Sequence, residues 1–266
     1  MRGVAIQVTR KETMNNQFDE LTKSMAARLT GRKGLKKFRV VCASVALGYL
    51  GIVTSGQAQT SVLCDPPGDG YFSNGHGSAV PPWLDIVQGT VTAAGDEHIL
   101  FTLTVAAAVP QAPAWKGVEE GGLLTWGWRL IGNLGDITIV KNGCLGSNGE
   151  NLPGAYYLDL FWSVQTSSFQ ALLVDNTTCT ETLVPFAFSA DRTQILLLVR
   201  QGLLANKVLI PDPANFQYAA TTVVWKSNSV GNHSFTHVDW APNLTDAGGV
   251  VVATWSAFSN SSHSCP

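Results

Sequence analysis

The sequence predicts an all-β fold, a single antiparallel β-sandwich of the jelly-roll or immunoglobulin-like kind. Short runs alternate between apolar and polar residues, and β-branched and aromatic residues dominate them. Gly, Asn, Asp and Pro separate the runs, and few segments have the period of an amphipathic helix. Many short strands without intervening helices favour a sandwich or a barrel, of which we expect the sandwich.

Two runs show the alternation most clearly. Residues 99–105 place Ile, Phe, Leu and Val on one face, and residues 124–130 place two Leu and two Trp on one face. A short helix is expected over 200–205, and surface loops over 106–122 and 141–155. The other predicted strands are 136–140, 156–162, 169–174, 186–188, 194–199, 221–225 and 250–255.

Residues 1–58 form a predicted export segment. Ten of the 17 Lys and Arg residues lie in it but only three of the 19 Asp and Glu residues, so this segment is basic and the remainder is acidic. An apolar stretch of 14 residues, 40–53, precedes small residues at Gly56 and Ala58, as in a cleavable secretory signal. The basic run before that stretch contains Arg28, Arg32, Lys33, Lys36, Lys37 and Arg39.

A retained membrane anchor is the alternative interpretation of this segment. Its 14 apolar residues fall short of the roughly 20 that span a bilayer. We therefore expect cleavage after Ala58, no membrane span in the mature chain, and a secreted, extracellular or periplasmic location. Met25 is an alternative start of the chain, which would explain residues 1–24.

The predicted mature part, residues 59–266, is expected to be one domain. It contains no long linker and no internal repeat of fixed period. Only 23 charged residues remain in it, and 16 of them are acidic. Nucleic-acid binding depends on Lys and Arg contacts to phosphates, so this composition excludes that class of partner.

Four cysteines remain after cleavage: Cys64, Cys144, Cys179 and Cys265. An even number in an exported chain predicts two disulfides. Three pairings are open, and we favour Cys144–Cys179 in the middle of the domain with Cys64–Cys265 joining its ends. A cysteine metal site is the alternative, but the sequence has no Cys-x-x-Cys and no His/Cys cluster with ligand spacing.

Four aspartates are the candidate metal ligands: Asp65, Asp69, Asp85 and Asp239. Asp65 and Asp69 flank a tight turn at Gly68, so their carboxylates can converge. Calcium takes about six to eight oxygen ligands, carboxylates among them, and the expected cofactor is a structural calcium ion. The alternative is that each aspartate only caps a turn by accepting a hydrogen bond from a backbone N–H.

The order of these motifs carries a family resemblance. Asp65-Pro-Pro-Gly68-Asp69, then Asp85-Ile86, then Asp239-Trp-Ala-Pro242 stand in that order along the chain. This order resembles a loose group of bacterial secreted β-sandwich modules, several of which accompany extracellular hydrolases and some of which are similar to carbohydrate-binding modules. The chain departs from that pattern in its additional cysteine-containing loops and in Asn243, where an Asp is frequent. The resemblance implies a fold more than a function.

Tryptophans are the candidate ligand-binding residues, because sugar rings stack on flat aromatic faces. Trp83, Trp115 and Trp240 lie in turn-rich, polar surroundings, so we expect them to be exposed. Trp126 and Trp128 share a strand face with Leu124 and Leu130, and we interpret them as core residues. The alternative for any Trp is packing in the interior.

The candidate catalytic residues are not accompanied by a recognised motif. His237 and Asp239 share one face of an extended segment and Ser234 is near them in sequence, but no Gly-x-Ser-x-Gly motif is present. Glu150 and Asp159 could be chosen as the acid pair of a glycosidase, without a specific signal for either. The sequence therefore favours a protein that is not an enzyme.

Three hypotheses on function follow from these residues. The first is an exported, non-catalytic binding module for a glycan or a cell-surface polymer, with a structural calcium ion. The second is an envelope domain that binds another protein. The third is a hydrolase whose site has no recognised motif.

Overall fold

A computed structural model describes residues 59–70, 80–95, 97–114, 123–131, 156–164, 166–175, 178, 180–204, 215–227, 233–242, 253–256 and 261–262. The predicted export segment, the predicted strand 136–140 and the predicted loop 141–155 lie outside these ranges. Within them the regular secondary structure is almost entirely β-strand, and none of their helices is both long and apolar enough to cross a membrane.

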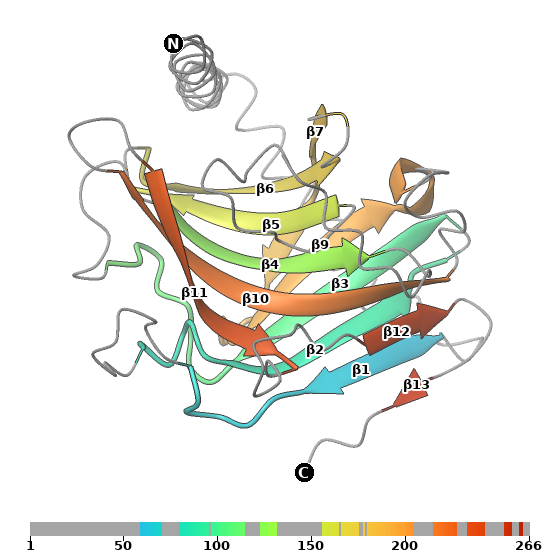
Figure 1. The fold of residues 1–266 in the computed structure, drawn as a ribbon, viewed down its shortest axis with the longest axis horizontal. Helices are drawn as coiled ribbons and strands as arrows, with labels where there is room; N and C mark the ends of the chain where they lie inside the picture. The colour runs from blue at the N-terminus through green and yellow to red at the C-terminus, as the bar shows by residue number, and fades with distance from the viewer. Residues whose placement is uncertain are drawn as a thin grey trace, which may run out of the picture.

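The strands form two sheets that pack face to face, as Figure 1 shows. The first sheet has the order β13-β1-β2-β3-β9-β8, and the second has the order β11-β10-β4-β5-β6-β7, with β12 also paired to β10. The first contains β1 (Thr60–Cys64), β2 (Ile86–Ala93), β3 (His98–Val105), β8 (Phe186–Phe188), β9 (Gln194–Arg200) and β13 (Ser261–Ser262). The second contains β4 (Leu123–Ile131), β5 (Tyr156–Ser163), β6 (Ser168–Asp175), β7 (Thr180–Leu183), β10 (Asn215–Ser227), β11 (His233–Ala241) and β12 (Ala253–Ser256).

The predicted all-β sandwich is confirmed, with antiparallel pairing throughout except between β1 and β13, which run parallel. Strands β3, β4, β5, β6, β8 and β9 lie where the alternating patterns predict them, within one or two residues at each end. The predicted helix is a single 3-10 turn, η1 (Gln201–Leu204). Strand β10 begins six residues before the predicted segment, at Asn215.

The core lies between the two sheets. The apolar face of β3 is buried together with Trp126 and Trp128, as the alternation predicts. Trp128 contacts Phe101 and Tyr218, with ring centroids 5.6 Å apart in both pairs. A hydrogen bond of 2.7 Å crosses this core between the hydroxyl groups of Ser61 in β1 and Tyr218 in β10. Burial raises the pKa of Tyr218 to about 12, so the hydroxyl stays neutral.

The opposite face of the second sheet is buried as well. Every residue of β5 from Tyr156 to Trp162 is buried, so the two faces of this strand do not differ in exposure. At the centre of the outer face, Arg129 Nη1 donates to Asp159 Oδ1 over 2.7 Å, and the Arg129 guanidinium lies 4.7 Å from the Tyr157 ring centroid. Burial raises the pKa of Asp159, and Arg129 opposes that shift.

A glycine makes room for this ion pair. A Cβ atom on Gly127 would lie 1.6 Å from Asp159 Oδ1. Gly127 is directly opposite Asp159 in the pairing of β4 with β5. The absence of a side chain at position 127 therefore allows the Asp159 carboxylate to lie over the β4 backbone and reach Arg129.

We expect Arg129→Met to lower the free energy of unfolding by about 3–5 kcal/mol, because it leaves a buried carboxylate without its partner. The double variant Arg129→Met/Asp159→Leu should recover most of that loss, since it removes both charges together. Urea unfolding of the two variants and the parent chain measures this. A double variant as unstable as the single variant would show that the two charges are not coupled.

Candidate metal centre

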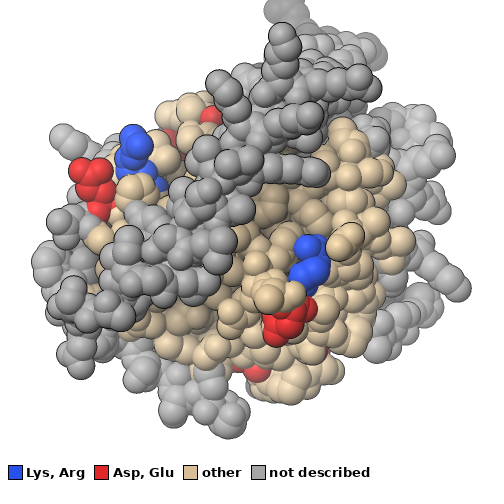
Figure 2. Space-filling model, turned by 180° about the vertical axis from the view of Figure 1, so that it is seen from behind, with Lys and Arg blue, Asp and Glu red and all other residues tan. Residues whose placement is uncertain are grey.

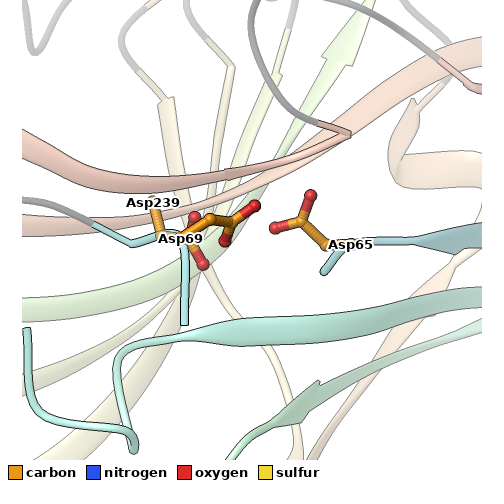
Figure 3. Close-up of side chains that lie close together, drawn as sticks. All are labelled: Asp65, Asp69 and Asp239. Atoms are coloured by element: carbon orange, nitrogen blue, oxygen red, sulfur yellow. The ribbon is translucent and has the colours of Figure 1, made fainter. Parts of the chain in front are cut away.

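The four aspartates predicted as metal ligands come from separate segments, and three of them, Asp65, Asp69 and Asp239, meet near the contact of β2 in the first sheet with β11 in the second. Asp65 follows β1, Asp69 lies in the turn after it, Asp85 precedes β2 and Asp239 lies in β11. Asp65, Asp69 and Asp239 each offer a carboxylate oxygen, and these three atoms all lie within 4.8 Å of one another. Figure 3 shows the carboxylates of Asp65 and Asp69 turned toward each other, with that of Asp239 beside Asp69.

The turn that carries Asp69 is attached to β2. The Asp65 N–H donates to the carbonyl oxygen of Val87 over 3.1 Å, which extends the pairing of β1 with β2 by one residue. Gly68 then takes φ +88°, a left-handed conformation that favours glycine. Its N–H donates to Asp85 Oδ2 over 2.7 Å. Asp85 therefore fixes the turn that brings Asp69 to the cluster.

Two β-bulges flank the aspartates. In β2 the register shifts between Ile86 and Gln88, which leaves Val87 as an additional residue opposite β3. In the pairing of β10 with β11, Thr222 is opposite Asp239 but Val223 is opposite His237, which leaves Val238 as an additional residue. Bulges bend a strand and change the direction of its side chains, and they are frequent beside functional sites.

Asp239 connects the two sheets. Its Oδ2 accepts a hydrogen bond of 2.5 Å from the N–H of Ile86 in β2, and its Oδ1 accepts one of 2.9 Å from the N–H of Trp240. A second link lies beside it, where Thr222 Oγ1 donates to the carbonyl oxygen of Leu84 over 2.7 Å. These bonds fix the position of the Asp239 carboxylate relative to the first sheet.

The cluster brings negative charge into a buried place. Asp65, Asp85 and Asp239 expose 4%, 4% and 5% of their surface. The pKa of Asp239 is raised to about 7, mainly by burial and also by the charges of Asp69 and Asp85, while the Ile86 and Trp240 amides oppose the shift. Burial also raises the pKa of Asp85, against the opposing effect of the Gly68 and Gly70 amides. The folded chain thus disfavours the ionised forms of Asp85 and Asp239.

Asp85 adds an independent indication of a ligand. Its Oδ1 is buried and has no hydrogen-bond partner among the residues that the structure describes. The Asp85 charge acts on Asp239, and the Asp69 charge acts on both. Buried carboxylate oxygens need a donor or a cation. Carboxylates from four positions, without His or Cys, are the ligand type that calcium prefers.

Turn capping, the alternative interpretation, describes part of the same geometry. Asp85 and Asp239 accept hydrogen bonds from the N–H groups of Gly68, Ile86 and Trp240. A carboxylate oxygen that accepts one hydrogen bond retains a lone pair for a cation, so capping and coordination are compatible at both residues.

Gly70 and Thr222 also shape this centre, and no pattern in the sequence predicts either of them. A Cβ atom on Gly70 would lie 2.7 Å from Val80 Cγ2 and 3.5 Å from Asp85 Oδ1, so the lack of a side chain permits the close approach of the turn. The role of Thr222 depends on its partner, Leu84, which is distant in sequence.

The predicted ligand-binding tryptophans differ in their surroundings. Trp240 exposes 8% of its surface and lies in β11 rather than in an open loop, so the expectation that it is exposed is wrong. Trp83 is half-buried, packs against the core and lies 6.0 Å from Trp126 between ring centroids. Trp115 lies outside the described residues. Of the two predicted tryptophans that the structure describes, Trp83 is the more exposed.

The remaining predicted sites are only partly within the described residues. Cys64 takes part in a disulfide, and its partner lies outside them, so the pairing of Cys64, Cys144, Cys179 and Cys265 stays a prediction. The side chains of Ser234 and His237 also lie outside the described part, and the hydrolase hypothesis gains no observation from them. Asp159, a weak catalytic candidate, is fully buried against Arg129.

Comparisons with known proteins do not assign this chain to a family. No model of a known protein family matches the chain, and no curated protein matches it. The resemblance to secreted β-sandwich modules therefore stays a prediction.

The pKa shifts predict how stability depends on pH when no divalent cation is present. The pKa of Asp239 is about 7 in the folded chain against an ordinary value of 3.8, so the folded state binds this proton more tightly. The contribution to stability is complete below about pH 4 and is lost as the pH rises to about 7, by at most about 4 kcal/mol. Urea unfolding in chelator between pH 4.5 and 7.5 measures this.

The same titration has two controls. Excess calcium should flatten the decline, because a bound cation stabilises the ionised carboxylate. Asp239→Asn should also flatten it, because no group then titrates at that position. A free energy of unfolding that is constant over this pH range in the metal-free parent chain would contradict the shift.

Proposed function

We propose that this chain is an exported, non-catalytic binding module with a structural calcium ion at Asp65, Asp69, Asp85 and Asp239. The observation that supports it best is the convergence of carboxylate oxygens of Asp65, Asp69 and Asp239 within 4.8 Å of one another, and the buried Oδ1 of Asp85 supports it as well. Two unit charges about 4 Å apart repel by about 4 kcal/mol at an effective dielectric constant of about 20. A divalent cation would replace this repulsion by attraction.

Calcium fits this ligand set better than other biological metals. Zinc favours His and Cys ligands, and magnesium retains several waters and is bound by one or two carboxylates. The donors here are carboxylates from four positions, and calcium accepts about six to eight oxygens at about 2.3–2.6 Å in flexible geometry. Exported modules commonly bind it at about 10⁻⁴–10⁻³ M.

The proposed ligand is a glycan or another neutral polymer of a cell surface. The predicted mature part is acidic, so it would repel a polyanion. Figure 2 shows that the described surface on one side of the molecule is mostly uncharged. Trp83, partly exposed and in tilted contact with the ring of Trp126, would supply an aromatic face on which a sugar ring could stack.

Export, cleavage after Ala58 and two disulfides belong to the same proposal. The basic, apolar segment before residue 59 supports export, and the participation of Cys64 in a disulfide agrees with an oxidising compartment. An envelope domain that binds another protein and a hydrolase remain the alternatives predicted from the sequence. The described residues favour neither of them over a binding module.

Thermal unfolding of the oxidised, exported chain tests the calcium site. Calcium at about 100 times its dissociation constant stabilises a folded protein by about 2.7 kcal/mol, which corresponds to about 5–10 °C in Tm for a domain of this size. We expect excess chelator to lower Tm by that amount. Asp69→Asn should abolish the response, because it removes a charge from the cluster without introducing a larger side chain.

Asp191→Asn is the matched control for this variant. Asp191 is an exposed aspartate that accepts hydrogen bonds from Ser189 and Thr193 within its own turn, away from the cluster. Its variant should retain the full response to calcium. A Tm of the parent chain that is the same in calcium and in chelator would reject the metal centre.

Glycan binding is tested by screening the calcium-loaded chain and then comparing variants of Trp83. We expect Trp83→Ala to weaken binding to any glycan found by about tenfold or more, as the loss of a stacking aromatic residue does at other interfaces. Trp83→Tyr should retain most of the affinity, because it keeps a flat ring. Equal affinities for the parent chain and both variants would remove Trp83 from the binding site.

A further inference from the structure

We propose that the cation acts as a latch that closes the N-terminal strand β1 onto the sandwich, so that the strand is fully ordered only where calcium is plentiful. This inference rests on the proposed calcium centre and adds a regulatory role to it.

Within its own sheet, β1 pairs extensively with one described strand and briefly with another. It pairs with β2 along five residues but with β13 along only two, Ser261 and Ser262. Figure 1 shows β1 near the edge of the first sheet, with the short β13 beyond it. Opening of strands near an edge costs less free energy than opening of central strands, because fewer backbone hydrogen bonds and buried contacts are lost.

The strand nevertheless completes the core. Leu63 is 1% exposed and belongs to the main hydrophobic cluster. Ser61 supplies the hydroxyl that bonds to Tyr218 of the opposite sheet. If β1 separated from β2, Leu63 would leave the core and the buried Tyr218 hydroxyl would lose that bond.

The ligands of the metal centre lie on different elements, and the turn after β1 is tied to the start of β2 by the Asp65–Val87 and Gly68–Asp85 hydrogen bonds. Asp239 is anchored in β11 by the amides of Ile86 and Trp240. Asp65 follows β1 directly, and Asp69 is carried by the turn after it. Without a cation, the repulsion among these carboxylates pushes the end of β1 and its turn away from Asp239. With a cation, the same residues draw β1 toward β2 and β11.

Occupancy of the calcium site would depend on the compartment in which the chain lies. Extracellular calcium modules work at about 10⁻⁴–10⁻³ M, whereas cytosolic calcium sensors respond at about 10⁻⁷–10⁻⁵ M. A site of the extracellular type therefore stays empty in the cytosol and fills after export. Cys64, the residue before Asp65, takes part in a disulfide, so both closures act at the same end of β1.

Hydrogen exchange with mass spectrometry tests the latch on the oxidised, exported chain, in millimolar calcium and in excess chelator. We expect chelation to speed exchange of the β1 amides, residues 60–64, by at least tenfold and to leave those of β4 and β5 within twofold. Asp69→Asn in calcium should exchange like the parent chain in chelator, and Asp191→Asn should exchange like the parent chain in calcium. Keeping the disulfide oxidised throughout leaves the cation as the only variable.

The outcomes separate the latch from the metal centre itself. If calcium raises Tm but exchange in β1 is unchanged, or changes equally in every strand, the latch is wrong and the calcium centre stands. If calcium neither raises Tm nor changes exchange, both are wrong. Selective slowing of exchange in β1 by calcium supports both.

Discussion

The hydrogen bond from the Ile86 amide to the Asp239 carboxylate joins the two sheets beside the buried aspartates of the candidate metal centre. It fixes the start of β2, which in turn positions Asp85. Asp85 then accepts from Gly68 and so sets the turn that carries Asp69. A bulge lies on each side of this bond, one in β2 and one in β11. The arrangement of these aspartates therefore depends on the contact between the start of β2 and β11.

The buried acids that the structure describes differ in how their negative charge is compensated. Asp159 lies in the second sheet and is compensated by Arg129 from the neighbouring strand, with Gly127 leaving the space for it. In our proposal, the charge of the aspartates in the candidate metal centre is compensated by a calcium ion from solution. The first arrangement is independent of the surroundings, whereas the second makes folding depend on them.

The sequence predicts the fold well where one face of a strand is apolar and the other is polar, as in β3. It predicts β11 poorly, because that strand mixes His, Ser and Thr with its apolar residues and contains a bulge. The burial of Trp240 follows from its place in that unrecognised strand. The four aspartates were found from turn motifs, but their convergence depends on the contact between β2 and β11, which no local pattern encodes.

The parallel pairing of β1 with β13 places the first and last described strands of the domain side by side. A domain whose ends lie together can be inserted into a loop of another protein, or be circularly permuted, with little disturbance of either partner. Neighbouring domains attached at either end would leave from the same edge of the first sheet. The opposite edges, formed by β7 and β8, would then face away from such neighbours.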